Sequence, residues 1–83
     1  MSALESLDAR GLLCPLPVIR TQDRVRNLQP GTELEVIATD PGTMQDIPSW
    51  CRVHGHKLLL AESVDNETGG GLVYRFQIRV CDA

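Results

Sequence analysis

Apolar and polar residues alternate in some stretches of this chain and recur with helical spacing in others. The clearest strand is predicted over Leu72–Cys81, where apolar and mostly polar side chains alternate and indicate one buried and one solvated face. Thr32–Thr39 places Leu34, Val36 and Ala38 on one face, which is typical of an interior strand. Less regular strands are predicted over Leu4–Ala9 and His56–Val64.

A first amphipathic helix is predicted over Pro15–Leu28. Its apolar residues Val18, Val25 and Leu28 fall at helical spacing, and charged residues lie mostly on the opposite side. The segment Gln29-Pro30-Gly31 that follows combines a helix breaker with a turn signal. We expect this helix to cover one face of a sheet.

A second helix is predicted within Thr43–His54, after Asp40-Pro41-Gly42 has ended the preceding strand. Pro48 would remove a hydrogen bond from a helix that begins at Thr43, whereas an N-cap at Asp46 would place Pro48 in the first turn. We therefore expect the helix to begin near Asp46 and to end at Gly55. Its apolar stripe comprises Met44, Ile47, Cys51 and His54.

The order strand, helix, strand, helix, strand, strand predicts an α/β (α+β) two-layer sandwich. A four-stranded mixed sheet with two helices on one face (βαβαββ) is the simplest way to bury these apolar stripes. Residues 1–83 contain no repeat or linker and are expected to form a single domain. The run Gly69-Gly70-Gly71 lacks a following helix and lysine, so we interpret Asp65–Gly71 as a hairpin turn, not a phosphate-binding loop.

Charge and composition narrow the classes of function. A net charge of -3 and a pI near 5.2 argue against direct nucleic-acid binding, which needs a basic face. No stretch approaches the roughly 20 apolar residues of a membrane span, and Met1–Asp8 lacks the pattern of a secretory signal. The 3 cysteines are too widely spaced for a disulfide framework. We expect a cytoplasmic protein without membrane contact.

The segment from Gly11 to Pro17 carries the candidate chemistry. Proline is tolerated in the first turn of a helix, so Pro15 and Pro17 indicate a helix start with Cys14 as its N-cap. The helix dipole and nearby cations such as Arg10 and Arg20 favour a thiolate, so a lowered pKa is expected for Cys14. Gly11 lets the backbone turn sharply and leaves room for an approaching partner.

The other candidate ligands and thiols have ordinary structural explanations. Cys51 lies on the apolar stripe of the second helix beside Trp50, and both are expected in the core. Cys81 lies near the chain terminus and has no evident role. His54 and His56 lack a third ligand at suitable spacing, so no metal site is predicted.

The motifs and their order resemble the TusA/SirA-like sulfur-carrier family over nearly the whole chain. The most specific feature is a CPxP segment after an LDxxG lead, with DIP at this distance. The matching residues are Leu7-Asp8-Ala9-Arg10-Gly11, Cys14-Pro15-Leu16-Pro17, Leu28-Gln29-Pro30-Gly31, Asp40-Pro41, Asp46-Ile47-Pro48 and Gly55-His56.

The resemblance implies that Cys14 receives sulfane sulfur as a persulfide and passes it to an acceptor protein with a reactive cysteine. Donors in the family include cysteine desulfurases and rhodanese-like proteins. Acceptors serve tRNA thiolation, molybdenum-cofactor synthesis or sulfur oxidation. The carrier itself requires no bound cofactor. A basic residue often precedes the DIP in the family, whereas this chain has Gln45 there, which bears on the choice of partner.

Recognition is expected from the surface around the sulfur, with candidate partner-binding residues Arg10, Ile19, Arg20, Asp40 and Gln45. One alternative is a non-catalytic binding or regulatory module in which CPxP only shapes the helix start. Another is a thiol redox switch, which would need a resolving cysteine near Cys14, where the sequence places neither Cys51 nor Cys81.

Overall fold

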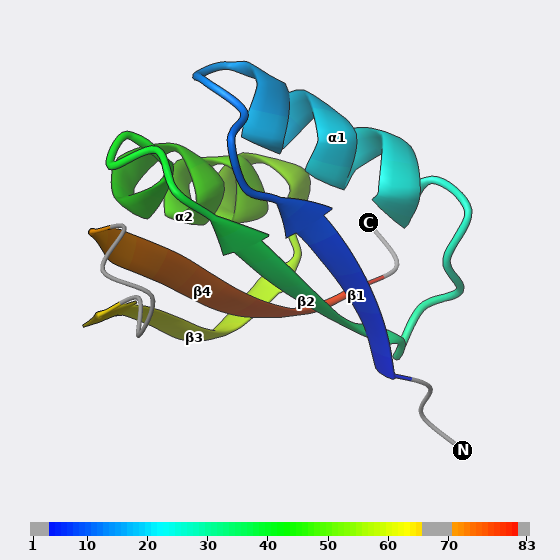
Figure 1. Ribbon diagram of the computed structural model, residues 1–83. Coiled ribbons are helices and arrows are strands. Elements are labelled where there is room, and N and C mark those ends of the chain that lie inside the picture. The colour runs from blue at the N-terminus through cyan, green and yellow to red at the C-terminus, as the bar shows by residue number, and fades with distance from the viewer. Residues whose placement is uncertain (1–3, 66–70, 82–83) are drawn as a thin grey trace.

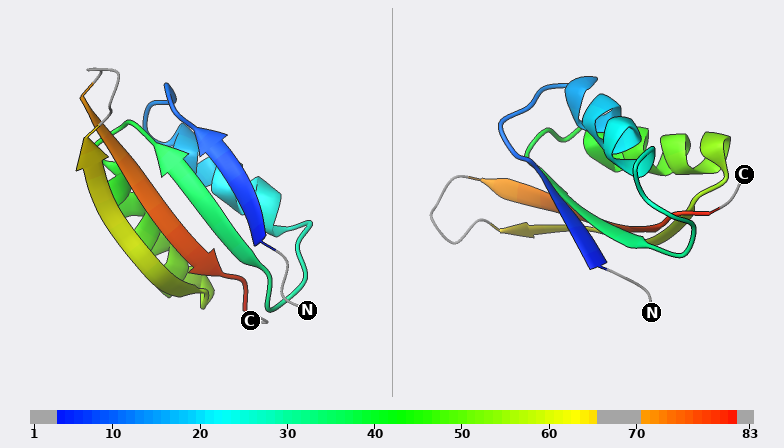
Figure 2. Two further views of the ribbon diagram at one scale, coloured as in Figure 1. Left: turned by 60° about the horizontal axis from the view of Figure 1, so that its bottom comes forward. Right: turned by 90° about the vertical axis from the view of Figure 1, so that its right-hand side faces the viewer.

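The computed structural model describes residues 4–65 and 71–81 and arranges them in two layers (Figure 1). A four-stranded sheet forms one layer, and the two helices lie together on one of its faces (Figure 2). The predicted α+β sandwich and its element order are confirmed. The elements are β1 (Leu4–Ala9), α1 (Leu16–Val25), β2 (Glu33–Ala38), α2 (Thr43–His54), β3 (Lys57–Asp65) and β4 (Leu72–Arg79).

The strands lie in the order β1-β2-β4-β3, so β2 is an interior strand as predicted. β1 pairs with β2 in parallel, whereas β4 pairs antiparallel with both β2 and β3, which makes the sheet mixed. The last residues of the parallel pair, Ala9 and Ala38, are register partners. Because parallel strands end at the same edge, the segments that follow β1 and β2 leave the sheet side by side.

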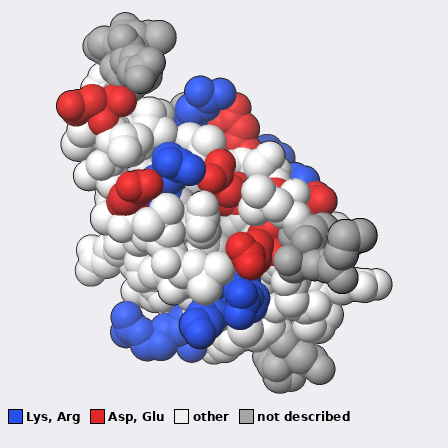
Figure 3. Space-filling model, turned by 90° about the horizontal axis from the view of Figure 1, so that it is seen from below, with Lys and Arg blue, Asp and Glu red and all other residues white. Residues whose placement is uncertain are grey.

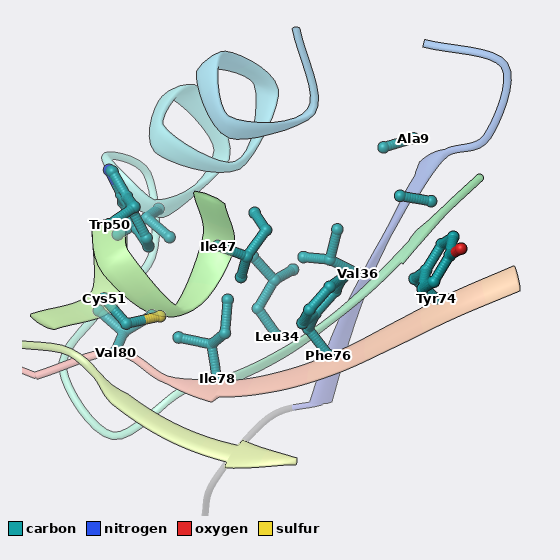
Figure 4. Close-up of a cluster of buried hydrophobic side chains, with 12 residues drawn as sticks. Ala9, Leu34, Val36, Ile47, Trp50, Cys51, Tyr74, Phe76, Ile78 and Val80 are labelled. Atoms are coloured by element: carbon teal, nitrogen blue, oxygen red, sulfur yellow. The ribbon is translucent and has the colours of Figure 1, made fainter. Parts of the chain in front are cut away.

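The core lies between the sheet and the helices (Figure 4). Leu34 and Val36 of β2 and Phe76 of β4 have no exposed surface and face the helices, as the alternation predicted. On α2, Ile47 is also fully buried. Among the described strand residues, apolar side chains are exposed at strand ends, where Leu4 is 70% and Leu72 is 45% exposed, and within β3, where Leu59 is 36% and Val64 is 37% exposed. Further members of the core are Ala9, Val25, Ala38, Trp50, Cys51, Tyr74, Ile78 and Val80.

The last turn predicted for α1 is not α-helical. The α-helix ends at Val25, and the chain continues to Leu28 through two tighter hydrogen bonds, from Asn27 N to Arg24 O and from Leu28 N to Val25 O. Such i to i+3 bonds are common at helix ends. Leu28 still packs against the core, so the apolar spacing was correct although the boundary was not.

The prediction that α2 begins near Asp46 is wrong, because the helix begins at Thr43 and contains Pro48 in its interior. Thr43 is 1% exposed, and its hydroxyl donates a 2.7 Å hydrogen bond to the carbonyl of Asp40. Burial and this contact hold the first turn in place, which offsets the ladder bond that Pro48 cannot make. Gly55 ends the helix in a left-handed conformation, as predicted.

The opposite face of the sheet carries cross-strand ion pairs. Arg75 of β4 contacts Glu35 of β2 at 2.8 Å and Glu62 of β3 at 3.4 Å, and Arg79 contacts Glu33 at 3.4 Å. Figure 3 shows acidic and basic groups side by side on this face, with uncharged side chains between them. This face therefore needs no second layer over it.

Two further predictions concern the turn between β3 and β4 and the presence of a membrane-spanning segment. The hairpin turn predicted over Asp65–Gly71 falls on residues 66–70, which lie outside the part of the chain that the structure describes. No helix in the described ranges is long and apolar enough to cross a membrane.

Candidate active site around Cys14

Cys14 lies in the loop between β1 and α1, and its free thiol is exposed. The expectation that Cys14 is the N-cap of α1 is wrong, because Pro15 occupies that position. The carbonyl of Pro15 accepts the first helical hydrogen bond, from Ile19 N at 3.1 Å, and this is the bond that defines an N-cap. The Cys14–Pro15 peptide bond is cis. The thiol therefore lies one residue before the N-cap and two residues before the first residue of α1.

The loop begins with the sharp turn expected at Gly11. Gly11 has a φ of 79°, a left-handed conformation in which other residues are strained. Its amide donates a 2.9 Å hydrogen bond to Oγ1 of Thr39, the residue after β2. The turn and this contact direct the chain over the end of the parallel strand pair.

Two carboxylates from the chain segment after β2 hold Cys14. Oδ2 of Asp40 accepts a 2.8 Å hydrogen bond from the Cys14 amide. Oδ2 of Asp46, on the first turn of α2, accepts a 2.9 Å hydrogen bond from the Cys14 thiol. None of the ion pairs among the described residues involves either carboxylate. The thiol therefore faces uncompensated negative charge.

This arrangement raises the pKa of the Cys14 thiol, so the expectation of a lowered pKa is wrong. The main cause is the hydrogen bond to Asp46, followed by desolvation and by the negative charges of Asp46 and Asp40. All of these favour the neutral thiol over the thiolate. A helix N-terminus favours an anion that has only amides and cations near it, whereas two carboxylates lie beside Cys14. At neutral pH, Cys14 is a protonated thiol that donates to a carboxylate.

The two arginines expected to stabilise a thiolate do not do so. Arg10 forms two 2.9 Å hydrogen bonds with the carboxylate of Asp8. This pairing lowers the pKa of Asp8 to about 2. Arg20 is exposed on α1 and takes part in none of the ion pairs of the described residues. Neither arginine is among the groups that shift the pKa of Cys14.

Apolar side chains are exposed next to the thiol in the sequence. Leu13 is 72% exposed, and Leu16 and Ile19 on the first turn of α1 are 42% and 46% exposed. Leu16 and Ile19 lie on the same face of the helix because they are three residues apart. On the first turn of α2, Met44 is 37% exposed. Such a concentration of exposed apolar surface is typical of a protein contact site.

The remaining thiols and histidines lie elsewhere. Cys51 is 2% exposed in the core, as predicted, and burial raises its pKa to about 11. Both histidine rings pack against Trp50. The distance between ring centroids is 5.4 Å for His54 and 5.0 Å for His56. His56 also accepts a 3.1 Å hydrogen bond from the Cys81 amide. Within residues 4–65 and 71–81, no group of three or more His, Cys, Asp or Glu residues could hold a metal ion.

The contact between Asp46 and the thiol was not predicted from the sequence. Asp46 was predicted as a helix cap and Asp40 as a partner-binding residue on the surface around Cys14, and both carboxylates contact Cys14 in the structure. The available signal was topological. A strand, helix, strand unit with parallel pairing places the residues after both strands at one edge, so acidic residues after β2 meet the loop after β1.

Residues 5–80 match the protein family described as sulfurtransferase TusA. The chain therefore belongs to the TusA sulfurtransferase family, whose members act in sulfur transfer. Its fold is similar to that of a SirA-like protein from Desulfitobacterium hafniense, known from a crystal structure. The TM-score is 0.70 at 21% sequence identity, and the alignment covers 95% of this chain and 99% of the other.

Proposed function

We propose that Cys14 accepts sulfane sulfur from a donor protein as a persulfide and passes it to a cysteine of an acceptor protein. The observation that carries this proposal is the free, exposed Cys14 thiol in a chain of the TusA family. Asp46 accepts a hydrogen bond from this thiol, and Asp40 accepts one from the Cys14 amide. The pathway served is tRNA thiolation, molybdenum-cofactor synthesis or sulfur oxidation.

The reaction is an exchange between sulfur atoms. The sulfur of Cys14 attacks the outer sulfur of a donor persulfide, and the donor leaves as a thiol. The acceptor cysteine then attacks the outer sulfur of the Cys14 persulfide in the same way. Each step needs the attacking and leaving sulfurs in line. Because Cys14 is exposed, a partner's sulfur can approach it in this way. The carrier itself needs no metal or bound cofactor for such an exchange.

Partner proteins would contact the surface around the thiol. Donors of the expected kind are cysteine desulfurases and rhodanese-like proteins. Ile19 offers exposed apolar area to such a partner, together with Leu13 and Leu16. Arg20 in the N-terminal half of α1 and Gln45 on the first turn of α2 are exposed and offer polar contacts. Arg10 and Asp40 are the other two candidate contact residues, although each already makes a hydrogen bond within the chain.

Intact-protein mass spectrometry tests the proposal. Wild type and Cys14→Ser are incubated with a cysteine desulfurase and cysteine, or with glutathione persulfide. We expect wild type to gain the mass of one or more sulfur atoms, removable by a reducing thiol, and Cys14→Ser to gain none at this position. Absence of sulfur on Cys14 with every donor, in a protein that is folded, would contradict the proposal and favour the non-catalytic binding module.

A further inference from the structure

The contact between Cys14 and Asp46 has a role in the proposed reaction that the family assignment does not supply. We infer that Asp46 is a catalytic residue whose carboxylate takes the Cys14 proton when sulfur is loaded and supplies a proton to the Cys14 sulfur when that sulfur leaves. This inference rests on the proposed function, because it concerns the same sulfur atom. It assigns a second residue, on a different element, to the transfer.

Geometry is the first support. Oδ2 of Asp46 lies 2.9 Å from Sγ of Cys14, within the reach that a general base requires. Among the described residues, Asp46 is the acceptor of the thiol hydrogen bond, whereas Asp40 binds the backbone amide. Asp46 therefore lies at the proton that must leave before the sulfur can attack.

Electrostatics is the second support. The charged groups that act on the thiol are Asp46 of α2 and Asp40 of the loop after β2, and both raise its pKa. Arg10, from the loop that carries Cys14, is held by Asp8. The thiol is therefore protonated at neutral pH, and free thiolate is scarce. Proton transfer to Asp46 during the attack provides a route that avoids the free thiolate, since the sulfur becomes more acidic as its new bond forms.

The loading step conserves atoms and electrons. Cys14–SH passes its proton to the Asp46 carboxylate while its sulfur bonds to the outer sulfur of a donor R–S–SH. The S–S bond of the donor breaks, and R–S⁻ leaves and takes the proton from Asp46 to become R–SH. Cys14 ends as Cys14–S–SH, so its sulfur is oxidised and the donor sulfur that lost its partner is reduced. In unloading, Asp46 passes the proton that the acceptor thiol releases to the leaving Cys14 sulfur.

The test compares loading rates of wild type and Asp46→Asn, in a Cys81→Ser background that leaves Cys14 as the accessible thiol. Glutathione persulfide is the donor, and the added sulfur is followed by mass spectrometry. Asparagine keeps the size of the side chain but accepts no proton. We expect loading at pH 7 to fall at least about 10-fold, since general acid–base catalysis typically contributes about 10²–10⁴-fold. Asp23→Asn, which removes an exposed carboxylate of α1, should load at the wild-type rate.

Two readouts separate proton transfer from a structural role. Alkylation of Cys14 by iodoacetamide, which requires only thiolate, should be faster in Asp46→Asn because the substitution removes the charge that raises the thiol pKa. The ratio of the Asp46→Asn loading rate to the wild-type rate should rise with pH as the variant gains thiolate. Ionisation of the donor affects both proteins equally and cancels from this ratio.

Loading of Asp46→Asn at or above the wild-type rate at pH 7 would overturn the inference while leaving the proposed function intact. Equal losses in loading and alkylation would overturn it as well, because they indicate damage to the position of the thiol. Failure of wild type itself to take up sulfur would instead contradict the proposed function.

Discussion

The amide of Cys14 donates a 2.8 Å hydrogen bond to Oδ2 of Asp40, so the loop after β1 is tied directly to the loop after β2. The two residues are 26 positions apart in the sequence. The parallel pairing of β1 and β2 brings them together, because both strands end at the same edge of the sheet. The position of the thiol thus depends on tertiary structure and not on the CPxP segment alone.

Removal of the Asp40 carboxylate should loosen this loop. Asp40→Ala deletes the acceptor of the Cys14 amide, and we expect the free energy of unfolding to fall by about 1–2 kcal/mol. Hydrogen exchange at the Cys14 amide should become faster, which NMR measures at this single position. Asp40→Asn keeps an oxygen acceptor and serves as the control, so its exchange should stay near wild type. Unchanged exchange in Asp40→Ala would show that this contact does not hold the loop.

The pairing of Asp8 with Arg10 should contribute stability that is lost at acidic pH. The pKa of Asp8 is lowered from 3.8 to about 2, mainly by its hydrogen bonds from Arg10. A lowered folded-state pKa adds stability that is present above pH 3.8 and is lost as pH falls through about 2. We expect Arg10→Gln to return the Asp8 pKa toward 3.8 in an NMR titration. The free energy of unfolding of this variant should depend less on pH between about 2 and 3.8. An Asp8 titration that does not move would contradict the ion pair.

Two substitutions on α2 should differ strongly in their effect on stability. Ile47 is 0% exposed, so Ile47→Ala should reduce the free energy of unfolding by about 2–5 kcal/mol through lost burial and a cavity. Val53 is 78% exposed on the same helix, so Val53→Ala should change it by less than about 0.5 kcal/mol. Denaturant unfolding measures both. Similar values for the two variants would contradict the placement of Ile47 on the buried face of α2 and of Val53 on its exposed face.

Pro48 should weaken α2, since it lies inside the helix and cannot donate to the carbonyl of Met44. Pro48→Ala supplies the missing donor, and we expect it to raise the free energy of unfolding by about 1–2 kcal/mol after the greater chain entropy of the unfolded state is considered. Thermal unfolding of the two proteins provides the measurement. A less stable alanine variant would indicate that the proline ring makes packing contacts worth more than the lost bond.

The three cysteines should differ in their reaction with iodoacetamide. Cys51 is 2% exposed with a pKa of about 11, so it should remain unlabelled in the folded protein and react only after unfolding. Cys14 is exposed, and its raised pKa should make its labelling increase with pH up to and beyond pH 9. Peptide mapping at several pH values distinguishes the sites. Labelling of Cys14 that reaches its maximum below pH 7 would contradict the influence of Asp46.

The fold could be predicted because each element carries its own pattern. Alternation in Leu72–Cys81 and in β2 depends only on neighbouring residues, and it gave the correct buried faces. The start of α2 could not be predicted in the same way. Local propensity disfavours Pro48 within a helix, but Thr43 and Ile47 are buried against the rest of the molecule, and that burial outweighs the local preference.

The chemistry of the site was predicted only in part. The segment around Cys14 identified an exposed thiol before a helix, because proline and glycine have strong local effects. The pKa of that thiol depends on Asp46, which is 32 residues away, and no local pattern reveals such a neighbour. The prediction of a lowered pKa, made from the helix dipole and the nearby arginines, therefore had the wrong sign.

Donor and acceptor must both use the one sulfur atom of Cys14, which lies on an exposed loop. This limits how the proposed relay can operate. A donor and an acceptor cannot reach the same sulfur at once, so each must leave before the other arrives. Very tight binding to either partner would then lower the flux of sulfur, because release would become the slowest step. The carrier should accordingly bind its partners only briefly, and it should pass more sulfur per unit time when neither partner is in large excess.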